Sequence, residues 1–400
     1  MVKKSTHTVI VPDAEQHASL AVIRSLGRAG FRVIAASHAP HPLGFSSRYA
    51  ECRELIASPL ERPEQFSADV ERLWKLYGAT LLMPVTEQST RALLEFPLPP
   101  GAPQLPVPSA RVFSTITDKA ALMHLAGSLG ISVPQQHLIA DLETAANAAA
   151  LHFPVVLKPA RSLGIASRFS VQYASAFEDL MQKLRLLPAD AFPILAQERI
   201  EGPGTGVFLL RWHDAVIARF AHQREREMPP SGGGSISCRS IALEDAPLVD
   251  AERLLERLEW NGVAMVEFKV CHRTGRPFLM EINPRFWGSL QLAIDAGVDF
   301  PLLLAKAMLG EPTTQQPPYR VGQRLRKIWG ELDWALALLR KSSAQLNLPP
   351  SFPPRWRALA SLARFGKTTR VETFRLRDPM PFFTDGRAWV AQHVRTRFNR

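Results

Sequence analysis

The chain has 400 residues, of which 46% are hydrophobic and 21% charged, a composition typical of a soluble globular protein with two to four domains. Its net charge of +11 belongs to the C-terminal region, because residues 313–400 carry 17 Lys and Arg against 5 Asp and Glu. No apolar run approaches the roughly 18–20 residues that a membrane-spanning helix needs, and the N-terminal apolar stretch is too short for a signal peptide, so we expect a cytoplasmic protein.

The N-terminal residues show strands that alternate with helices. A strand at Thr8–Val11, a helical pattern and a second strand at Phe31–Ala36 form a β-α-β unit, which predicts a parallel sheet. The first turn lacks glycine, which argues against a dinucleotide-binding fingerprint. A helix over Glu64–Tyr77 and a strand over Thr80–Val85 follow. A proline-rich stretch then marks the end of this domain, which we place at residues 1–106.

The middle of the chain continues this alternation, so we expect an α/β protein with α+β character in this part. A helix is predicted to begin near Asp118, with Asp118 or Thr117 as its cap, and to end near Gly130. Later strands are predicted at Phe153–Pro159, Ile194–Ile200, Val207–Trp212, Gly262–Val270 and Pro277–Asn283, with a helix at Pro247–Leu258 and a glycine-bearing loop at Ala160–Ala166.

The last two strands carry acidic side chains that are predicted to face each other. A short turn with Thr274 and Gly275 joins them into an antiparallel hairpin. With the register centred on Thr274, Glu267 lies opposite Glu281, and Asn283 shares their face. Two carboxylates across a ladder repel each other, and a divalent cation reverses that interaction. Mg²⁺ prefers such oxygens, so we predict a metal site; the alternative is a solvent-facing hairpin with incidental charges.

Six motifs, in this order, resemble those of the ATP-grasp superfamily, specifically its carboxylate–amine ligase and carbamoyl-phosphate-synthase-like branch. They span roughly Thr8–Gly310 and comprise DKAAL (Asp118–Leu122), LGISVP (Leu129–Pro134), VVLKP (Val155–Pro159), QERIEG (Gln197–Gly202), VEFK (Val266–Lys269) and EINPRFWGS (Glu281–Ser289). EINPR with an upstream VEF is fairly specific, whereas each other motif alone is weak. The resemblance implies a parallel-sheet domain at residues 1–106, a small ATP-grasp lobe at 107–195 and a large lobe with the metal site at 196–312.

The resemblance also implies a nucleotide site. Lys119 and Lys158 are expected to contact the phosphates of ATP, and Lys158 also to lie near the adenine. The segment that joins the lobes, whose backbone is expected to read the adenine edge, comprises Gln197, Glu198, Arg199 and Ile200. Many relatives carry a ribose-binding acid shortly after this segment, where this chain has GPGTG. Glu201 is the substitute candidate.

Metal and catalytic roles follow from the same resemblance. Glu267, Glu281 and Asn283 match magnesium ligands, which are expected to hold two ions that share Glu281, with Mn²⁺ as an alternative metal. Arg285 matches the arginine that holds the acyl-phosphate oxyanion. Phosphoryl transfer depends on positioning and on cations against developing charge, and Arg285 and Lys158 supply such charge. Because an acyl phosphate must be shielded from water, a mobile lid is also expected.

Several weaker signals leave alternatives open. The run Arg224–Ser235 joins arginines to a triple glycine, and it either approaches the phosphates or the substrate carboxylate, or is a disordered connector. SLARFGKT at Ser361–Thr368 nearly matches a P-loop, but it lacks the first glycine and follows a helical pattern, so it is predicted to be a helix end. His222 belongs to no ligand spacing and is expected to be a surface or satisfied core residue. The three cysteines form no C-x-x-C pair and are expected to be reduced.

The basic region at residues 313–400 is predicted to be mainly helical, with apolar residues at Ile328, Leu332, Leu336 and Leu339. Its basic charge is compatible with contact to an anionic membrane or a substrate carrier, or with binding to a polyanion. A second stripe lies in Arg355–Lys367, where Trp356, Leu359 and Ala363 have helical spacing among basic residues. Packing of this stripe against its own protein, with a solvated basic face for the region as a whole, is the favoured interpretation. No specific nucleic acid is expected, because no nucleic-acid-binding motif accompanies the charge.

Together these features predict an ATP-dependent ligase that activates a small-molecule carboxylate as an acyl phosphate and joins it to an amine, with release of ADP and phosphate. The alternatives are a non-catalytic ATP-binding regulator and a polyanion-binding protein that uses the basic region. Loss of the metal ligands would support the regulator, but this sequence retains them. A homodimer is expected from the resemblance. The sequence names neither the acid nor the amine.

Overall fold

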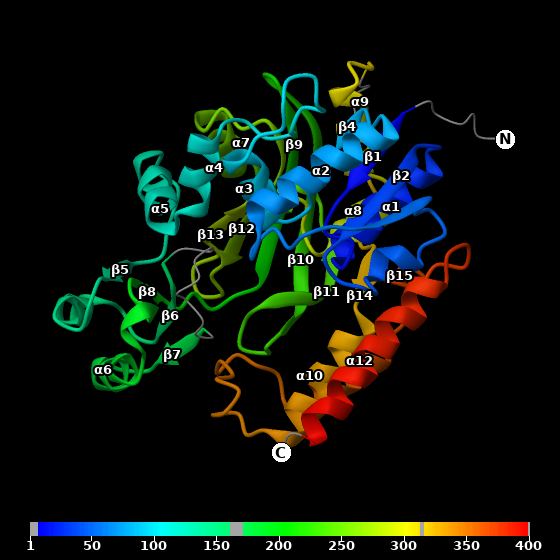
Figure 1. Ribbon diagram of the computed structural model, residues 1–400. Helices are drawn as coiled ribbons and strands as arrows, with labels where there is room; N and C mark the ends of the chain where they lie inside the picture. Colours follow the sequence, from blue (N-terminus) through cyan, green and yellow to red (C-terminus); the bar gives the residue numbers. More distant parts are fainter. Residues whose placement is uncertain (1–6, 161–170, 313–315, 399–400) are drawn as a thin grey trace.

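The computed structural model describes residues 7–160, 171–312 and 316–398, and it contains three β-sheets with helices packed around them (Figure 1). The predicted α/β class, with a parallel sheet at the N-terminal end and mixed elements after it, is confirmed. Among the described residues, none of the helices combines the length and hydrophobicity that crossing a membrane requires. Short 3₁₀ helices are labelled η.

The N-terminal sheet has the strand order β3-β2-β1-β4, and all its pairings are parallel, as the β-α-β pattern predicts. Its part of the chain comprises β1 (Thr8–Val11), α1 (His17–Arg28), β2 (Arg32–Ser37), η1 (Leu43–Ser46), β3 (Cys52–Leu55), α2 (Pro63–Tyr77), β4 (Leu81–Leu82) and α3 (Glu87–Glu95). β4 is shorter than the predicted strand at Thr80–Val85, because Pro84 has no N–H with which to continue the ladder.

A small antiparallel sheet with the order β5-β8-β6-β7 follows. This part comprises α4 (Ala110–Thr117), α5 (Lys119–Ser128), β5 (Gln136–Ile139), η2 (Thr144–Ala150), β6 (Val155–Pro159), β7 (Gln172–Ala174), α6 (Phe177–Arg185), η3 (Ala189–Ala191) and β8 (Ile194–Glu198). Its buried residues, such as Leu157, Leu180 and Ile194, form a core of their own. α5 begins at its predicted cap, since Asp118 Oδ1 accepts hydrogen bonds from the N–H groups of Ala120 and Ala121.

The large sheet has the order β13-β12-β9-β10-β11-β14-β15. Its elements up to residue 312 are β9 (Gly204–Trp212), β10 (Ala215–Met228), β11 (Gly234–Ser240), η4 (Leu243–Asp245), α7 (Leu248–Arg257), β12 (Gly262–Val270), β13 (Pro277–Asn283), α8 (Leu290–Ala296) and α9 (Phe300–Met308). The pattern analysis missed β10 and β11. The end of β10 reads Arg-Glu-Arg-Glu and lacks apolar alternation, because these charged side chains pair with one another and with neighbouring elements.

The C-terminal region adds two short strands to the predicted helices. It comprises β14 (Arg324–Arg326), α10 (Ile328–Arg340), α11 (Arg355–Ala360), η5 (Ser361–Ala363), β15 (Thr369–Val371) and α12 (Met380–Phe398). The helix predicted around Ile328, Leu332, Leu336 and Leu339 is confirmed as α10, but Leu332 and Leu339 are 41% and 67% exposed. The helix instead buries Trp334 and Leu338 together with Glu331, whose carboxylate pairs with arginines of the large sheet. The P-loop-like segment follows a helix, as expected.

Candidate active site

The hairpin of β12 and β13 brings the two predicted carboxylates together. Glu267 pairs with Glu281 across the ladder. Near the turn, however, the register differs by one residue from the one predicted, since Val270 pairs with Pro277. A bulge that leaves Met280 unpaired then restores the predicted register. The bulge therefore decides that a carboxylate, and not a methionine, faces Glu267.

These carboxylates line a cleft of about 420 Å³ between the large and the small sheet. Of the predicted site residues, the cleft wall brings together Lys158, Gln197, Glu267, Glu281, Asn283 and Arg285. Lys158 Nζ donates a hydrogen bond to Gln197 Oε1 at 2.8 Å, which fixes the ammonium on the small-sheet side. On the opposite side, Arg285 Nη2 donates to Asn283 Oδ1 at 2.9 Å, and Asn283 Nδ2 donates to Glu281 Oε1 at 2.9 Å. The cleft thus places cations on both sides of the paired acids.

The electrostatics of the two carboxylates differ. Burial raises the pKa of Glu281, but the charges of Lys119 and Lys158 and the hydrogen bond from Asn283 outweigh it, so the pKa is lowered overall. Burial, together with the nearby carboxylates of Glu281 and Glu227, raises the pKa of Glu267 against the opposing effect of Arg224. Glu281 is therefore the more firmly ionised of the pair.

Arg224 supplies the cation that pairs with Glu267. Its guanidinium donates to Glu267, and also to Glu227 Oε1 at 3.1 Å and to the carbonyl of Gly233 at 3.0 Å. The sequence indicated only that this arginine lies near a glycine-rich run. The structure shows that the run is the turn between β10 and β11, in which Gly232–Gly234 line the cleft, so a disordered connector is the wrong interpretation. Tyr173 of the small sheet donates to the carbonyl of Ser231 in this turn at 3.1 Å.

Two further charged residues lie near the cleft. Lys119, at the start of α5, is close enough to influence the pKa values of Lys158 and Glu281. Glu87, the first residue of α3, was missed by the sequence analysis. Burial raises the pKa of Glu87, Arg285 and Lys119 oppose this, and its Oε1 is buried with no hydrogen-bond partner among the described residues. The only sequence signal for Glu87 was its position just after a short strand of a parallel sheet, where binding residues commonly lie.

The other residues predicted to bind the nucleotide do not line the cleft. Arg199, Ile200 and Glu201 line a second cavity of about 450 Å³ beside the cleft. The side chain of Glu198 accepts a hydrogen bond from the backbone N–H of Gln135 at 3.4 Å, which ties the joining segment to the small sheet. Glu201 therefore does not line the cleft that holds Glu267. Residues 161–166 of the predicted glycine-bearing loop lie outside the described residues.

His222 also lines the cleft, although the sequence analysis assigned it no role. It is buried, and its Nδ1 lies 3.2 Å from Ser289 Oγ while its ring packs edge-on against Phe208. Its Nε2 has no partner among the described residues. Burial holds the pKa of His222 well below its usual value, so the ring is neutral near pH 7.

The oxygen atoms of the cleft can hold a hard cation such as Mg²⁺ only if a bound ligand supplies the rest of its coordination. Within the described residues, no group of three or more His, Cys, Asp or Glu side chains is arranged to hold a metal ion. Glu267, Glu281 and the amide of Asn283 are three oxygen-bearing groups on one face of the hairpin. Mg²⁺ requires six oxygens and usually takes several from water and phosphate. These residues therefore fit a magnesium ion that is bound together with a phosphate ligand.

Comparisons with known proteins point to one fold. A family model described as ATP-grasp in the biosynthetic pathway with Ter operon matches residues 190–330, which span the large sheet up to β14. No curated protein matches the chain by sequence.

Three solved structures illustrate the likeness in fold. An L-amino acid ligase from Bacillus licheniformis is 17% identical with a TM-score of 0.59, over 76% of this chain and 75% of that one. An N5-carboxyaminoimidazole synthetase from Staphylococcus aureus is 13% identical with a TM-score of 0.62, over 81% and 82%. The biotin carboxylase domain of a Hydrogenobacter thermophilus 2-oxoglutarate carboxylase, in complex with MgADP, ADP and bicarbonate, is 15% identical with a TM-score of 0.61, over 79% and 73%. The ATP-grasp fold that the motifs imply is therefore confirmed for this chain.

Proposed function

We propose that this protein is an ATP-dependent ligase that activates a carboxylate as an acyl phosphate and joins it to an amine. The observation that carries the proposal is the pairing of Glu267 with Glu281 in a cleft whose walls also carry Lys158 and Arg285. This arrangement combines oxygen ligands for a cation with fixed positive charges, which is what phosphoryl transfer requires. The names of the similar structures, an amino acid ligase and a carboxyaminoimidazole synthetase, agree with such chemistry.

ATP would lie in the cleft with its phosphates between the two sheets. Lys158 and Lys119 would bind phosphate oxygens, and the backbone of Gln197–Ile200 would contact the adenine. Glu267, Glu281 and Asn283 would hold two Mg²⁺ ions, with Mn²⁺ able to use the same oxygen ligands. When bound, these ions neutralise charge on the phosphates. One of the similar structures is a complex with MgADP, which supports ATP and Mg²⁺ as the molecules that bind in this cleft.

The chain's own residues then position the reacting groups. A carboxylate oxygen of the acid attacks the γ-phosphorus, and ADP leaves. The amine next attacks the acyl carbon, phosphate leaves and the amine loses a proton. Arg285, which Asn283 and the carbonyl of Phe286 hold in place, would orient the acyl phosphate through its remaining N–H donors.

The experiment that tests the proposal is ADP release with Mg²⁺ over pairs of carboxylic acids and amines, with mass detection of the amide product. A ligase releases ADP only when an acid is present, and it forms the amide only when an amine is added. Release of ADP that never depends on an added acid, together with no amide from any pair, would contradict the proposal.

Two broader properties are proposals that the sequence and the resemblance support. We expect the protein to act in the cytoplasm, and we expect a homodimer. Contact with a membrane or a carrier through the basic region has no support in the structure, whose C-terminal segment packs against the N-terminal domain through buried pairs such as Arg24 with Asp378.

A pH dependence of ATP binding follows from Lys158. Its side chain lies in the cleft wall, where burial and the charge of Lys119 lower its pKa from 10.5 to about 8. The ammonium is therefore charged below about pH 8 and loses its proton as the pH rises through that value. Because phosphates bind the charged form, the affinity for ATP should fall at least about tenfold between pH 7 and pH 9.5.

The measurement is titration calorimetry with ATP at constant ionic strength, without acid or amine. The Lys158→Arg variant is the matched comparison, because a guanidinium keeps its charge over this range. Its ATP affinity should change little with pH. A wild-type affinity that is equally insensitive would show that Lys158 does not contact the phosphates in its charged form.

A further inference from the structure

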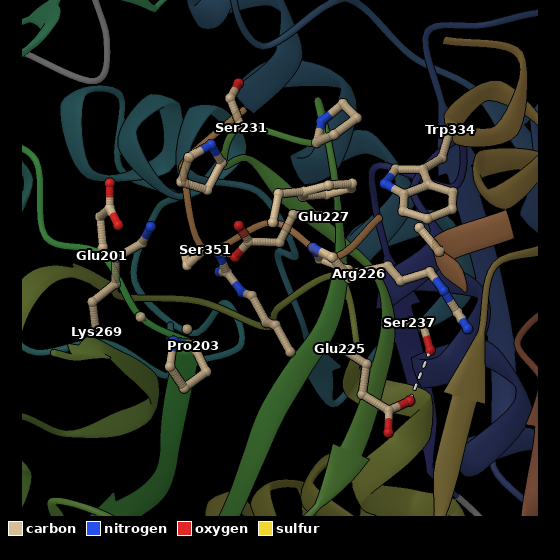
Figure 2. A pocket seen from close by; sticks show the side chains of 18 of the residues that line it. Glu201, Pro203, Glu225, Arg226, Glu227, Ser231, Ser237, Lys269, Trp334 and Ser351 are labelled. Atoms are coloured by element: carbon tan, nitrogen blue, oxygen red, sulfur yellow. Dashed lines mark hydrogen bonds and ion pairs between the residues drawn. The ribbon is translucent and has the colours of Figure 1, made fainter. Parts of the chain in front are cut away.

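The second cavity lies directly beside the proposed ATP cleft. It has a volume of about 450 Å³, and it is lined by the segment that joins the lobes, by the β10–β11 hairpin and by the C-terminal region, including β14, α10 and the loop before α11 (Figure 2). Arg224, Glu227 and Lys269 line both this cavity and the cleft. A ligand in the second cavity therefore shares a wall with the proposed site of phosphoryl transfer. The proposed adenine segment borders this cavity at the side of Glu201, whereas the proposed function leaves the side that Arg226 and Trp334 form without an occupant (Figure 2).

The lining of this cavity has a large excess of positive charge. Its cations are Arg199, Arg224, Arg226, Lys269, Arg324, Arg326 and Arg364, and its carboxylates are Glu201, Glu225 and Glu227. Two more carboxylates, Glu267 and Glu331, pair with lining arginines from outside the wall. Even with these two included, cations outnumber carboxylates seven to five. Such a wall favours an anionic ligand.

The strongest part of this charge is a buried triad. Arg226 and Arg326 both pair with the single carboxylate of Glu331, and the three side chains are only 12%, 4% and 4% exposed. The carbonyl groups of Ser361 and Leu362 accept further hydrogen bonds from these arginines but supply no negative charge. One buried positive charge is therefore without a compensating carboxylate. Burying such a charge is costly unless a counter-ion is close.

The same cavity also has an apolar side. This side of the cavity is lined by Trp334, Phe352, Pro349 and Pro353. The guanidinium of Arg226 lies 5.9 Å from the centre of the Trp334 ring. Figure 2 shows Arg226 and Trp334 among the side chains of one pocket that also contains Lys269 and Glu201. A ligand that fits these walls combines negative charge with an apolar body.

Resting on the proposed ligase function, we infer that this cavity binds the acid substrate and that the substrate is a dianionic acid with an apolar body. One anionic group lies against Arg226 and Arg326, and the reacting carboxylate reaches the wall that Arg224 and Lys269 share with the cleft. The C-terminal region thereby determines substrate specificity, although it lies outside the proposed ATP site.

The test compares two probes that share a phenyl ring and differ in one carboxylate, benzylsuccinate and 4-phenylbutanoate. Titration calorimetry on the full chain should show that benzylsuccinate binds at least about tenfold more tightly. Arg226→Met should remove most of this preference by weakening benzylsuccinate, with little effect on 4-phenylbutanoate. This substitution leaves Arg326 paired with Glu331, so it orphans no buried carboxylate.

The matched control is Arg239→Met, which changes an exposed arginine of β11 outside the residues that line either cavity. It should leave the binding of both probes unchanged. Equal binding of the two probes, no binding of either, or an unchanged preference in Arg226→Met would overturn the inference. Binding of ATP to the same preparations is measured separately, so a failure of the ligase proposal and a failure of the cavity assignment remain distinguishable.

Discussion

Replacing Glu281 with glutamine is expected to lower acid-dependent ADP release by about 100- to 1,000-fold, the usual effect of removing one preorganised charge from an active site. Glutamine keeps the shape of the side chain, and its amide oxygen can still accept the hydrogen bond that Asn283 Nδ2 donates. The lost quantity is the negative charge, which faces Glu267 across the hairpin and is the more firmly ionised of the two. The measurement is the rate of ADP release at saturating Mg²⁺ and ATP.

Glu256→Gln provides the control for this experiment. Glu256 is an exposed residue of α7 outside the residues that line the two cavities, so the same change of charge there should leave the rate unaffected. Circular dichroism should show that both variants remain folded. A Glu281→Gln variant with the wild-type rate would remove the paired carboxylates from the mechanism, and with them the ligase proposal.

The cleft could be predicted from the sequence where local patterns determine the geometry. Alternation in a strand places residues two apart on one face, so the shared face of Glu281 and Asn283 required only the correct assignment of a strand. The pairing of Glu267 with Glu281 was predicted from a turn centred on Thr274. The turn is placed differently, and the bulge at Met280 compensates for the difference. No pattern in the strand indicates that bulge.

Features that depend on distant parts of the chain were not predictable in this way. β10 ends in alternating charges that resemble a loop, and its strand conformation is stabilised by partners such as Glu331, which lies 105 residues after Arg226. Glu331 is also buried in α10 together with Trp334 and Leu338. Its pairing with arginines of the large sheet explains why this face of the helix is buried, although the apolar residues of the helix do not indicate it. Glu87 lies near Arg285 and Glu281 only because the N-terminal domain packs beside the cleft. Tertiary contacts determine these three features, and such contacts cannot be read from the local pattern of hydrophobic residues.

Replacing Asp378 with alanine is expected to destabilise the protein by about 3–5 kcal/mol, because it leaves a buried arginine without its carboxylate. Asp378 Oδ2 lies 2.8 Å from Arg24 Nε and accepts a hydrogen bond from Ser47 Oγ at 2.8 Å, while the N–H of Arg48 donates to Oδ1 at 2.9 Å. Both charged side chains are 3% exposed. The pair ties the segment before α12 to α1, so urea denaturation and proteolysis of the C-terminal region should both report the loss.

The double variant Arg24→Met/Asp378→Leu distinguishes an unpaired charge from a simple loss of contacts. Replacing both members of a buried pair by apolar residues is often close to neutral, so the double variant should be more stable than Asp378→Ala alone. Glu51→Gln serves as the comparison for an exposed pair, since the side chains of Glu51 and Arg32 are 53% and 43% exposed. This substitution should lower the free energy of unfolding by less than about 1 kcal/mol. If the double variant is no more stable than Asp378→Ala, the hydrogen bonds from Ser47 and Arg48, and not the charge of Arg24, make Asp378 necessary.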